Sequence, residues 1–191
     1  MPPSRQPGFE NTRSNEYWFC FSSPNVESHL IISISENHYL ALAKGPLVED
    51  HVLIVPVEHM PSTLSLSSEF EVELCQFQNS LQRYCKSQGK EVIFLEWVFI
   101  RATHANLQAI PIPSSKAVIV EKAFNLASQK MGFKFVSKNF DSISDGRKFL
   151  KTQADEESSL SYAEISGGII LLHHVEEKVR FLAQFGCEVG I

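Results

Sequence analysis

Three polar side chains alternate with small or apolar ones in the segment His104-Ala105-Asn106-Leu107-Gln108. In an extended chain successive side chains point to opposite faces, so His104, Asn106 and Gln108 would share one face of a strand. An imidazole and two carboxamides can together donate and accept hydrogen bonds around a phosphate or ribose oxygen. A polar row is more often the solvent side of a half-buried sheet, so the row alone predicts a site only weakly.

A second segment, HVLIVPVEH at residues 51–59, is a continuous apolar run with a histidine at each end. Runs of this kind are typical of strands that are buried on both faces of a sheet. The two histidines would therefore flank a central strand, close enough to join the polar row. The candidate binding residues are His51, His59, His104, Asn106 and Gln108.

The remaining histidines carry weaker signals. His29 and His38 lie at the ends of a predicted hairpin, while His173 and His174 are adjacent and would point to opposite sides of a strand. We interpret all four as surface or turn residues. Lys44 precedes the apolar run and could meet a phosphate at the rim of a pocket, although a solvated lysine is the simpler interpretation.

The elements that must position these side chains form an α+β pattern. A predicted hairpin precedes the central strand, and a long amphipathic helix follows it, with apolar residues at spacings of four and three from Phe70 to Tyr84. The predicted strands cover residues 29–34, 39–43, 51–57, 91–100 and 107–113. We therefore expect an antiparallel sheet of about five strands with a long helix packed on it.

The character of the chain changes after Pro113, where we place a domain boundary. The elements predicted beyond it are a helix at 120–131, a strand at 133–136, a strand pair at 162–165 and 169–172, and a helix at 175–185. The polar, serine-rich stretch 139–159 is predicted to be a mobile connection. Residues 1–16 are expected to form a disordered lead-in.

The composition excludes several classes of function. With 191 residues, 43% of them hydrophobic, the chain has the profile of one globular domain, or of one domain with a smaller appended one. A net charge of −5 argues against a broad basic surface for nucleic acid, but is compatible with a local basic pocket. Only strand-length apolar runs occur and no signal peptide is visible, so we predict no membrane segment and an intracellular location.

The order of hairpin, apolar strand, long helix and polar strand resembles the histidine-triad superfamily of nucleotide hydrolases and transferases. More specifically, YWFCFSSPNVESHLIISI, HYLALAKGPLVEDHVLIVPVEHMPSTL and HANLQAIPIP resemble the first C-terminal domain of CwfJ-like proteins, over residues 17–113. Residues 114–191, with YAEI and VRFLAQFG, resemble a truncated start of that family's second C-terminal region. The resemblance implies a histidine-triad-like fold.

The resemblance also assigns a role to each position of the polar row. In the superfamily, a His-x-His-x-His or His-x-His-x-Gln triad binds the α-phosphate, and the middle histidine attacks it to form a covalent intermediate. His104 falls at the first position and Gln108 at the third, but Asn106 stands where the nucleophile is expected. A carboxamide has no basic lone pair comparable with that of imidazole, so this covalent route is not expected. His104 is the one candidate for a catalytic role, as an acid or a base.

Some superfamily members are similar to zinc proteins, with a Cys-x-x-Cys pair near the N-terminus, a histidine after the central strand and the first triad histidine. The corresponding positions here are Tyr17, Cys20, His59 and His104. Tyr17 replaces one thiolate, which leaves three candidate zinc ligands where a structural site usually has four. Two interpretations stay open: a degenerate zinc site, or a buried thiol beside a pocket histidine.

The resemblance implies a splicing-associated domain in the nucleus, with or without a cytoplasmic pool. Such a domain would recognise an RNA or nucleotide phosphate, or a protein of the spliceosome or of lariat debranching. The alternatives are an active nucleotide hydrolase or transferase with water as the attacking group, and a purely structural protein–protein module. Asn106 favours binding over catalysis.

Overall fold

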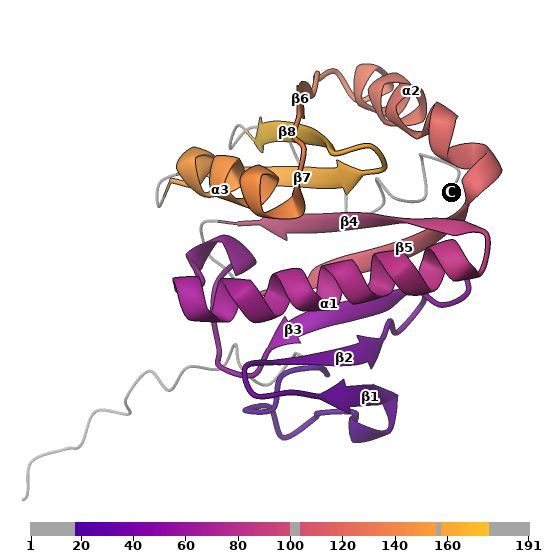
Figure 1. Cartoon of the computed structure of the whole chain (residues 1–191). Coiled ribbons are helices and arrows are strands. Elements are labelled where there is room, and N and C mark those ends of the chain that lie inside the picture. The colour runs from indigo at the N-terminus through magenta and orange to yellow at the C-terminus, as the bar shows by residue number, and fades with distance from the viewer. Residues whose placement is uncertain (1–17, 100–103, 156–157, 176–191) are drawn as a thin grey trace, which may run out of the picture.

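The computed structural model describes residues 18–99, 104–155 and 158–175, which form one antiparallel sheet with helices on both faces (Figure 1). The strands are β1 (Ile31–Ile34), β2 (His38–Leu42), β3 (Val52–Pro56), β4 (Lys90–Val98), β5 (Leu107–Pro113), β6 (Val136–Asn139), β7 (Ser159–Ile165) and β8 (Ile169–Val175). The helices are α1 (Ser68–Ser87), α2 (Ser114–Lys130) and α3 (Ile143–Gln153), with 3₁₀ turns η2 (Ser28–Leu30) and η3 (Thr63–Ser65). The strand order is β1-β2-β3-β5-β4-β7-β8-β6.

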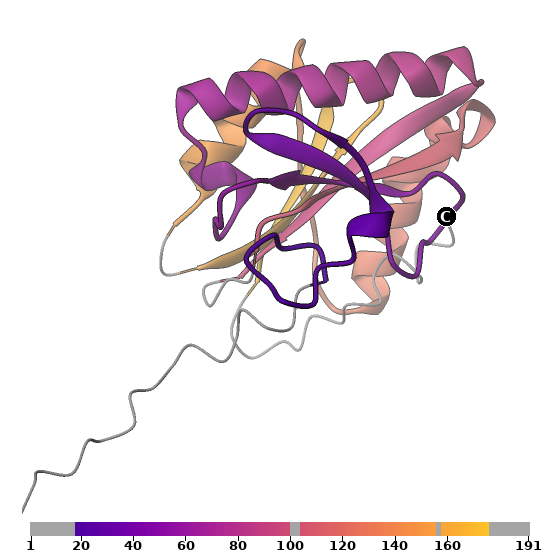
Figure 2. The ribbon, with the colours of Figure 1, turned by 90° about the horizontal axis from the view of Figure 1, so that it is seen from below.

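The α+β class, the buried central strand and the long helix are confirmed. Every residue of β3 is buried, as its unbroken apolar sequence predicts. Helix α1 places Leu74 in the core under it, together with the apolar residues of β4 and β5 that face it. Helix α3 lies beside α1, whereas α2 covers the opposite face of the sheet (Figures 1 and 2).

The predicted size of the sheet was wrong, because the described residues form one sheet of eight strands, where a sheet of about five with a separate small extension was expected. Strand β7 pairs with β4, from Phe94 opposite Glu164 to Val98 opposite Leu160, and β8 and β6 continue the sheet beyond it. Pairing between strands so far apart in the sequence cannot be predicted from the residues near either strand. Strands on both sides of residue 113 therefore share one sheet, while the domain boundary placed there stays a prediction.

The predicted mobile connection at 139–159 was also wrong, because it contains α3. Ser142 caps this helix by accepting a hydrogen bond from the backbone N–H of Asp145, at 3.1 Å. Leu150 and Arg147 are both buried on its inner face. Because Arg147 is charged, this segment was interpreted as a polar linker, although the structure buries Arg147 in a helix of the core. The predicted helix at 175–185 begins at a residue that the structure places at the end of β8, and its remaining residues, like the lead-in at 1–16, lie outside the described residues.

Two features of the sheet prepare the site. Strands β3 and β5 are antiparallel neighbours, with Ile54 opposite Leu107, so the segment after β3 meets the segment before β5. Strand β5 begins at Leu107, so His104 and Asn106 precede it. None of the helices in the described ranges has the length and apolarity that a membrane crossing requires.

Candidate functional site

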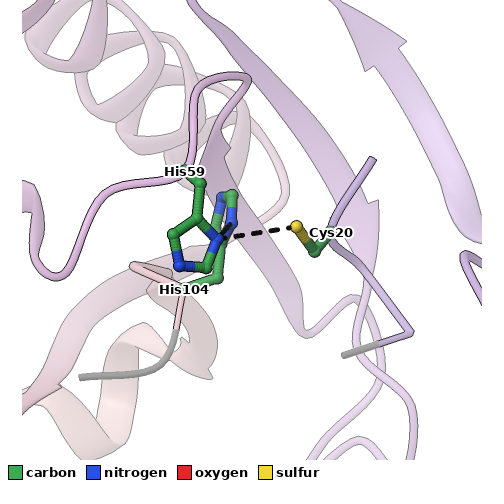
Figure 3. A group of neighbouring side chains, drawn as sticks. All are labelled: Cys20, His59 and His104. Carbon is green, nitrogen blue, oxygen red and sulfur yellow. Dashed lines mark hydrogen bonds between the residues drawn. The ribbon is translucent and has the colours of Figure 1, made fainter. Parts of the chain in front are cut away.

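Cys20, His59 and His104 converge at one end of the sheet (Figure 3). The Nδ1 atoms of His59 and His104 are 3.0 Å apart, and the Cys20 sulfur is 3.7 Å from His59 Nδ1. Cys20 and His104 are each only 1% exposed, whereas His59 is exposed. The structure thus brings together the three residues that the sequence marked as candidate metal ligands.

The local sequence explains why these side chains meet. Trp18, Phe19 and Phe21 pack on the apolar face of β2 and β3, and Phe21 stacks on Tyr39 with ring centroids 4.3 Å apart. This packing carries Cys20 against the end of β3. On the other side, the Ala105 N–H donates to the Met60 carbonyl at 2.7 Å, which joins the segments of His59 and His104.

A hydrogen bond sets the tautomer of His104. Its Nε2 lies 2.8 Å from the Pro56 carbonyl oxygen, which can only accept, so the ring proton is on Nε2 and Nδ1 presents a lone pair. Burial lowers the pKa of His104, a hydrogen bond to Pro56 opposes this shift, and nearby His59 lowers the pKa further. A neutral imidazole oriented by a backbone carbonyl is the usual form of a metal-ligating histidine.

The donor set fits a zinc ion. Tetrahedral zinc with ordinary bond lengths places two nitrogen ligands about 3.3 Å apart and a nitrogen and a sulfur about 3.6 Å apart. The three candidate donor atoms lie within 4.8 Å of one another, with the separations given above. The fourth predicted position, Tyr17, lies outside the described residues.

The other predicted binding residues line a separate pocket of about 270 Å³ on the α2 side of the sheet. Lys44, His51, Asn106 and Gln108 are its polar lining residues, and its aromatic walls are Trp18, Phe19 and Trp97. His104 and His59 do not line it. The ring of Phe19 borders both places, since its centroid is 5.9 Å from that of His104. The predicted binding set therefore divides into two adjacent clusters.

His51 offers the pocket a hydrogen-bond donor. The Leu47 N–H donates to His51 Nδ1 at 3.2 Å, so the proton of the neutral ring is on Nε2. His51 is 5% exposed, and its Nε2 has no hydrogen bond of ordinary geometry among the described residues. Burial lowers the pKa of His51, although the neighbouring Gln108 carboxamide opposes this shift. His51 and Gln108 therefore form a polar pair on the pocket wall, which can exchange hydrogen bonds with an oxygen-rich ligand.

Lys44 lies at the rim of this pocket, where its ammonium forms an ion pair with Glu27. A bound phosphate would therefore compete with Glu27 for this charge. The aromatic walls were missed by reasoning from the sequence, although the run YWFCF, which holds Trp18 and Phe19, was a signal for two of them. A larger cavity of about 760 Å³ lies between α1 and α3 and contains none of the predicted site residues.

The interpretation of His38 as a surface residue was wrong. His38 is fully buried, and its Nδ1 is 2.8 Å from a carboxylate oxygen of Glu73. His29 and His174 are exposed, as expected. His173 is half-buried and stacks on Phe133, with ring centroids 4.1 Å apart.

Comparison with known proteins identifies a matching family and several sequence relatives. Residues 6–125 match the family described as "protein similar to CwfJ C-terminal". Zinc finger CCCH domain-containing protein 64 of Arabidopsis thaliana is 52% identical over 186 residues, which cover 97% of this chain and 31% of the relative. Human CWF19-like protein 1 is 36% identical over 174 residues, which cover 90% of this chain and 31% of the relative. The chain thus spans about a third of the length of these relatives.

Solved structures share the fold at low identity. The crystal structure of yeast Ap4A phosphorylase Apa2 in complex with AMP aligns with a TM-score of 0.52 and 15% identity, over 80% of this chain and 62% of that one. A histidine triad nucleotide-binding protein from Candida albicans aligns over 44% of this chain and 66% of that one, with a TM-score of 0.38 and 19% identity. The fold of the phosphorylase is thus shared, and the described residues of this chain form an α+β fold with eight strands in one sheet.

Proposed function

The chain belongs to the family of proteins similar to the CwfJ C-terminal region, and from this premise we propose that it is a binding domain for an RNA or nucleotide phosphate. The ligand would enter the 270 Å³ pocket. We further propose that it works in the nucleus, in association with splicing, alongside proteins of the spliceosome or of lariat debranching.

The observation that carries the proposal is that the buried His51 imidazole and two carboxamides line one pocket together. Asn106 and Gln108 line the same pocket and can each donate an N–H to a phosphate or ribose oxygen. The aromatic side chains Trp18 and Trp97 offer apolar walls of the kind on which a base stacks. A ligand with an oxygen-rich part and a flat ring would use both halves of the pocket.

Binding without covalent catalysis is the form of the proposal that the residues favour. Asn106 cannot act as the nucleophile. His104 is a poor candidate for an acid or base acting in the pocket, because Nε2 is bonded to Pro56 and Nδ1 faces His59. We propose that His104, His59 and Cys20 hold a zinc ion, which would cross-link the N-terminal segment to the segments after β3 and before β5.

Calorimetric titration of the protein with AMP and with a short single-stranded RNA tests the proposal. Replacing His51 with Phe or Gln108 with Leu removes a pocket donor, so each variant should bind about 5- to 10-fold more weakly, the effect of one lost hydrogen bond. His29→Asn, which changes an exposed histidine outside the pocket, is the control.

If the wild-type protein does not bind, or if both pocket variants bind as tightly as the wild type, the pocket is not the site. Incubation with dinucleoside polyphosphates and adenylylated substrates is the companion assay. Turnover that disappears in His104→Ala would replace the binding proposal with the hydrolase alternative.

A further inference from the structure

A buried charged network lies between α1, α3, β4 and β7, apart from the pocket. Its centre is Arg147 of α3, which is 1% exposed. The Arg147 Nε donates to Glu71 at 2.6 Å, and its Nη1 donates to the Tyr162 hydroxyl oxygen at 2.7 Å. A fully buried arginine with several specific partners is uncommon, because removing it from water is costly unless every donor is satisfied.

The network converges on Thr63, which is fully buried in η3. Arg147 Nη2 donates to both the carbonyl and the hydroxyl oxygen of Thr63, each at 3.0 Å. The carboxylate of Glu96 accepts from the Thr63 N–H at 2.8 Å and from its hydroxyl at 2.5 Å. Tyr162 adds a third hydrogen bond to Glu96 at 2.6 Å. The Thr63 hydroxyl is also 3.1 Å from that of Tyr162, so Thr63 bonds to residues of β4, β7 and α3.

Thr63 closes the same loop that carries His59. This loop follows β3 and leads to α1, and the candidate site contacts the last residue of β3 and one residue of the loop. The Pro56 carbonyl orients His104, and the Met60 carbonyl accepts from the Ala105 N–H. The contacts of Thr63 with the network form a third attachment. Further along the loop, Lys151 of α3 donates to the Leu66 carbonyl at 2.8 Å, so Thr63 is the network's attachment nearest to His59.

We propose that Arg147, Glu96 and Tyr162 are positioning residues, which act through Thr63 to fix the loop that carries His59 and orients His104. Residues of the C-terminal part of the chain therefore set the geometry of the candidate site without touching it. The functional meaning of this inference rests on the proposed site, but the loop geometry is measurable without any ligand.

Amide hydrogen exchange of Ala105 is the primary test, because this N–H reports the contact between the loop and the segment of His104. Thr63→Val keeps the shape of the side chain but removes the hydroxyl that bonds both Arg147 and Glu96. We expect exchange of the Ala105 amide to accelerate at least 10-fold in Thr63→Val and to return towards the wild-type rate in Thr63→Ser. The amides shared by β2 and β3 should change much less.

The matched control is Thr152→Val, since Thr152 is an exposed threonine of α3 that bonds only within its own helix turn. If Thr63→Val does not fold, Tyr162→Phe provides a milder change in the same network. An unchanged Ala105 rate would overturn the proposal. So would equal acceleration across β2 and β3, which would mean that the network contributes only to global stability.

Cobalt binding gives a second, spectroscopic test. Titration with Co²⁺ should produce sulfur-to-cobalt absorption in the wild-type protein, with about 10-fold weaker binding in Thr63→Val and recovery in Thr63→Ser. Equal cobalt affinity in wild type and Thr63→Val would overturn the positioning role. If the wild-type protein gives no such absorption, the zinc proposal fails, and the exchange rates still decide the role of the network.

Discussion

The bonding of His104 determines which of the two clusters it serves. Its Nε2 proton is committed to the Pro56 carbonyl, so the free lone pair on Nδ1 faces His59. Asn106 and Gln108 follow it in the sequence but line the neighbouring pocket. His104 thus presents its Nδ1 lone pair to the cluster with Cys20, while Asn106 and Gln108 face the pocket.

Removal of one candidate ligand tests the metal site at this scale. We expect the wild-type protein to bind one zinc ion per chain, and Cys20→Ala or His59→Ala to weaken binding at least 100-fold, because two remaining ligands hold zinc poorly. Competition with a chromophoric chelator measures the affinity. Cys75→Ala, which removes a free thiol of α1, should bind zinc like the wild type. Unchanged affinity in Cys20→Ala would rule out this site.

At the scale of elements, one carboxylate of α1 anchors the turn between β1 and β2. Glu73 accepts hydrogen bonds from the Ser35 hydroxyl at 2.5 Å and the Asn37 N–H at 2.9 Å, and pairs with His38 at 2.8 Å. Partial burial raises the pKa of Glu73, but the hydrogen bonds from Ser35, His38 and Asn37 outweigh it, so the pKa is lowered overall. The carboxylate is therefore ionised, and the hairpin is attached to the helix through it.

Glu73→Gln should lower the free energy of unfolding by about 1–2 kcal/mol, because a carboxamide has one acceptor oxygen where the turn offers several donors. Urea unfolding measures the change. Glu69→Gln, at an exposed position of the first turn of α1, should alter the stability by no more than about 0.5 kcal/mol, the usual range for an exposed site. Equal effects of the two substitutions would mean that the hydrogen bonds of Glu73 to the turn contribute little to stability.

At the scale of the whole molecule, the sheet is continuous from β1 to β6, with β4 between β5 and β7. The core beneath α1 combines residues from both halves of the chain, including Ile54 and Phe94 with Leu150 and Tyr162. Burial on this scale also affects ionisation. It lowers the pKa of both His38 and His51, although neighbouring groups oppose each shift.

These two histidines predict a loss of stability in acid. Their folded-state pKa values lie below the unfolded value of about 6.5, so their contribution is complete above that pH and is lost as the pH falls below it. We expect the free energy of unfolding, measured in urea with EDTA, to fall by about 1 kcal/mol or more between pH 7.5 and 5.5. His38→Phe should flatten this dependence, whereas His29→Asn should not. An equal slope in all three proteins would contradict the assignment.

Glu164 has the opposite effect on how stability depends on pH. Burial raises its pKa to about 7, against the effect of Arg147 and a hydrogen bond from Gln78. A carboxyl group with a raised pKa stabilises the fold at low pH, and this contribution is lost as the pH rises through about 7. Glu164→Gln should therefore make the stability rise more steeply between pH 5.5 and 7.5 than it does in the wild type. A shallower rise would contradict this assignment.

The sequence by itself determined the features that depend on neighbours along the chain. The periodicity from Phe70 to Tyr84 predicted α1, and the unbroken apolar run predicted β3. The motif order indicated the family, because it depends on residue type alone.

Only the tertiary structure decided how the candidate residues group. Alternation of side chains holds only within a strand, and β5 begins at Leu107, so the sequence could not show that Asn106 stays with Gln108 while His104 joins Cys20 and His59. The structure also showed that Arg147 belongs to the core, since its partners Thr63 and Tyr162 come from other elements. A polar residue is buried only where distant groups satisfy its hydrogen bonds, and local sequence contains no record of those partners.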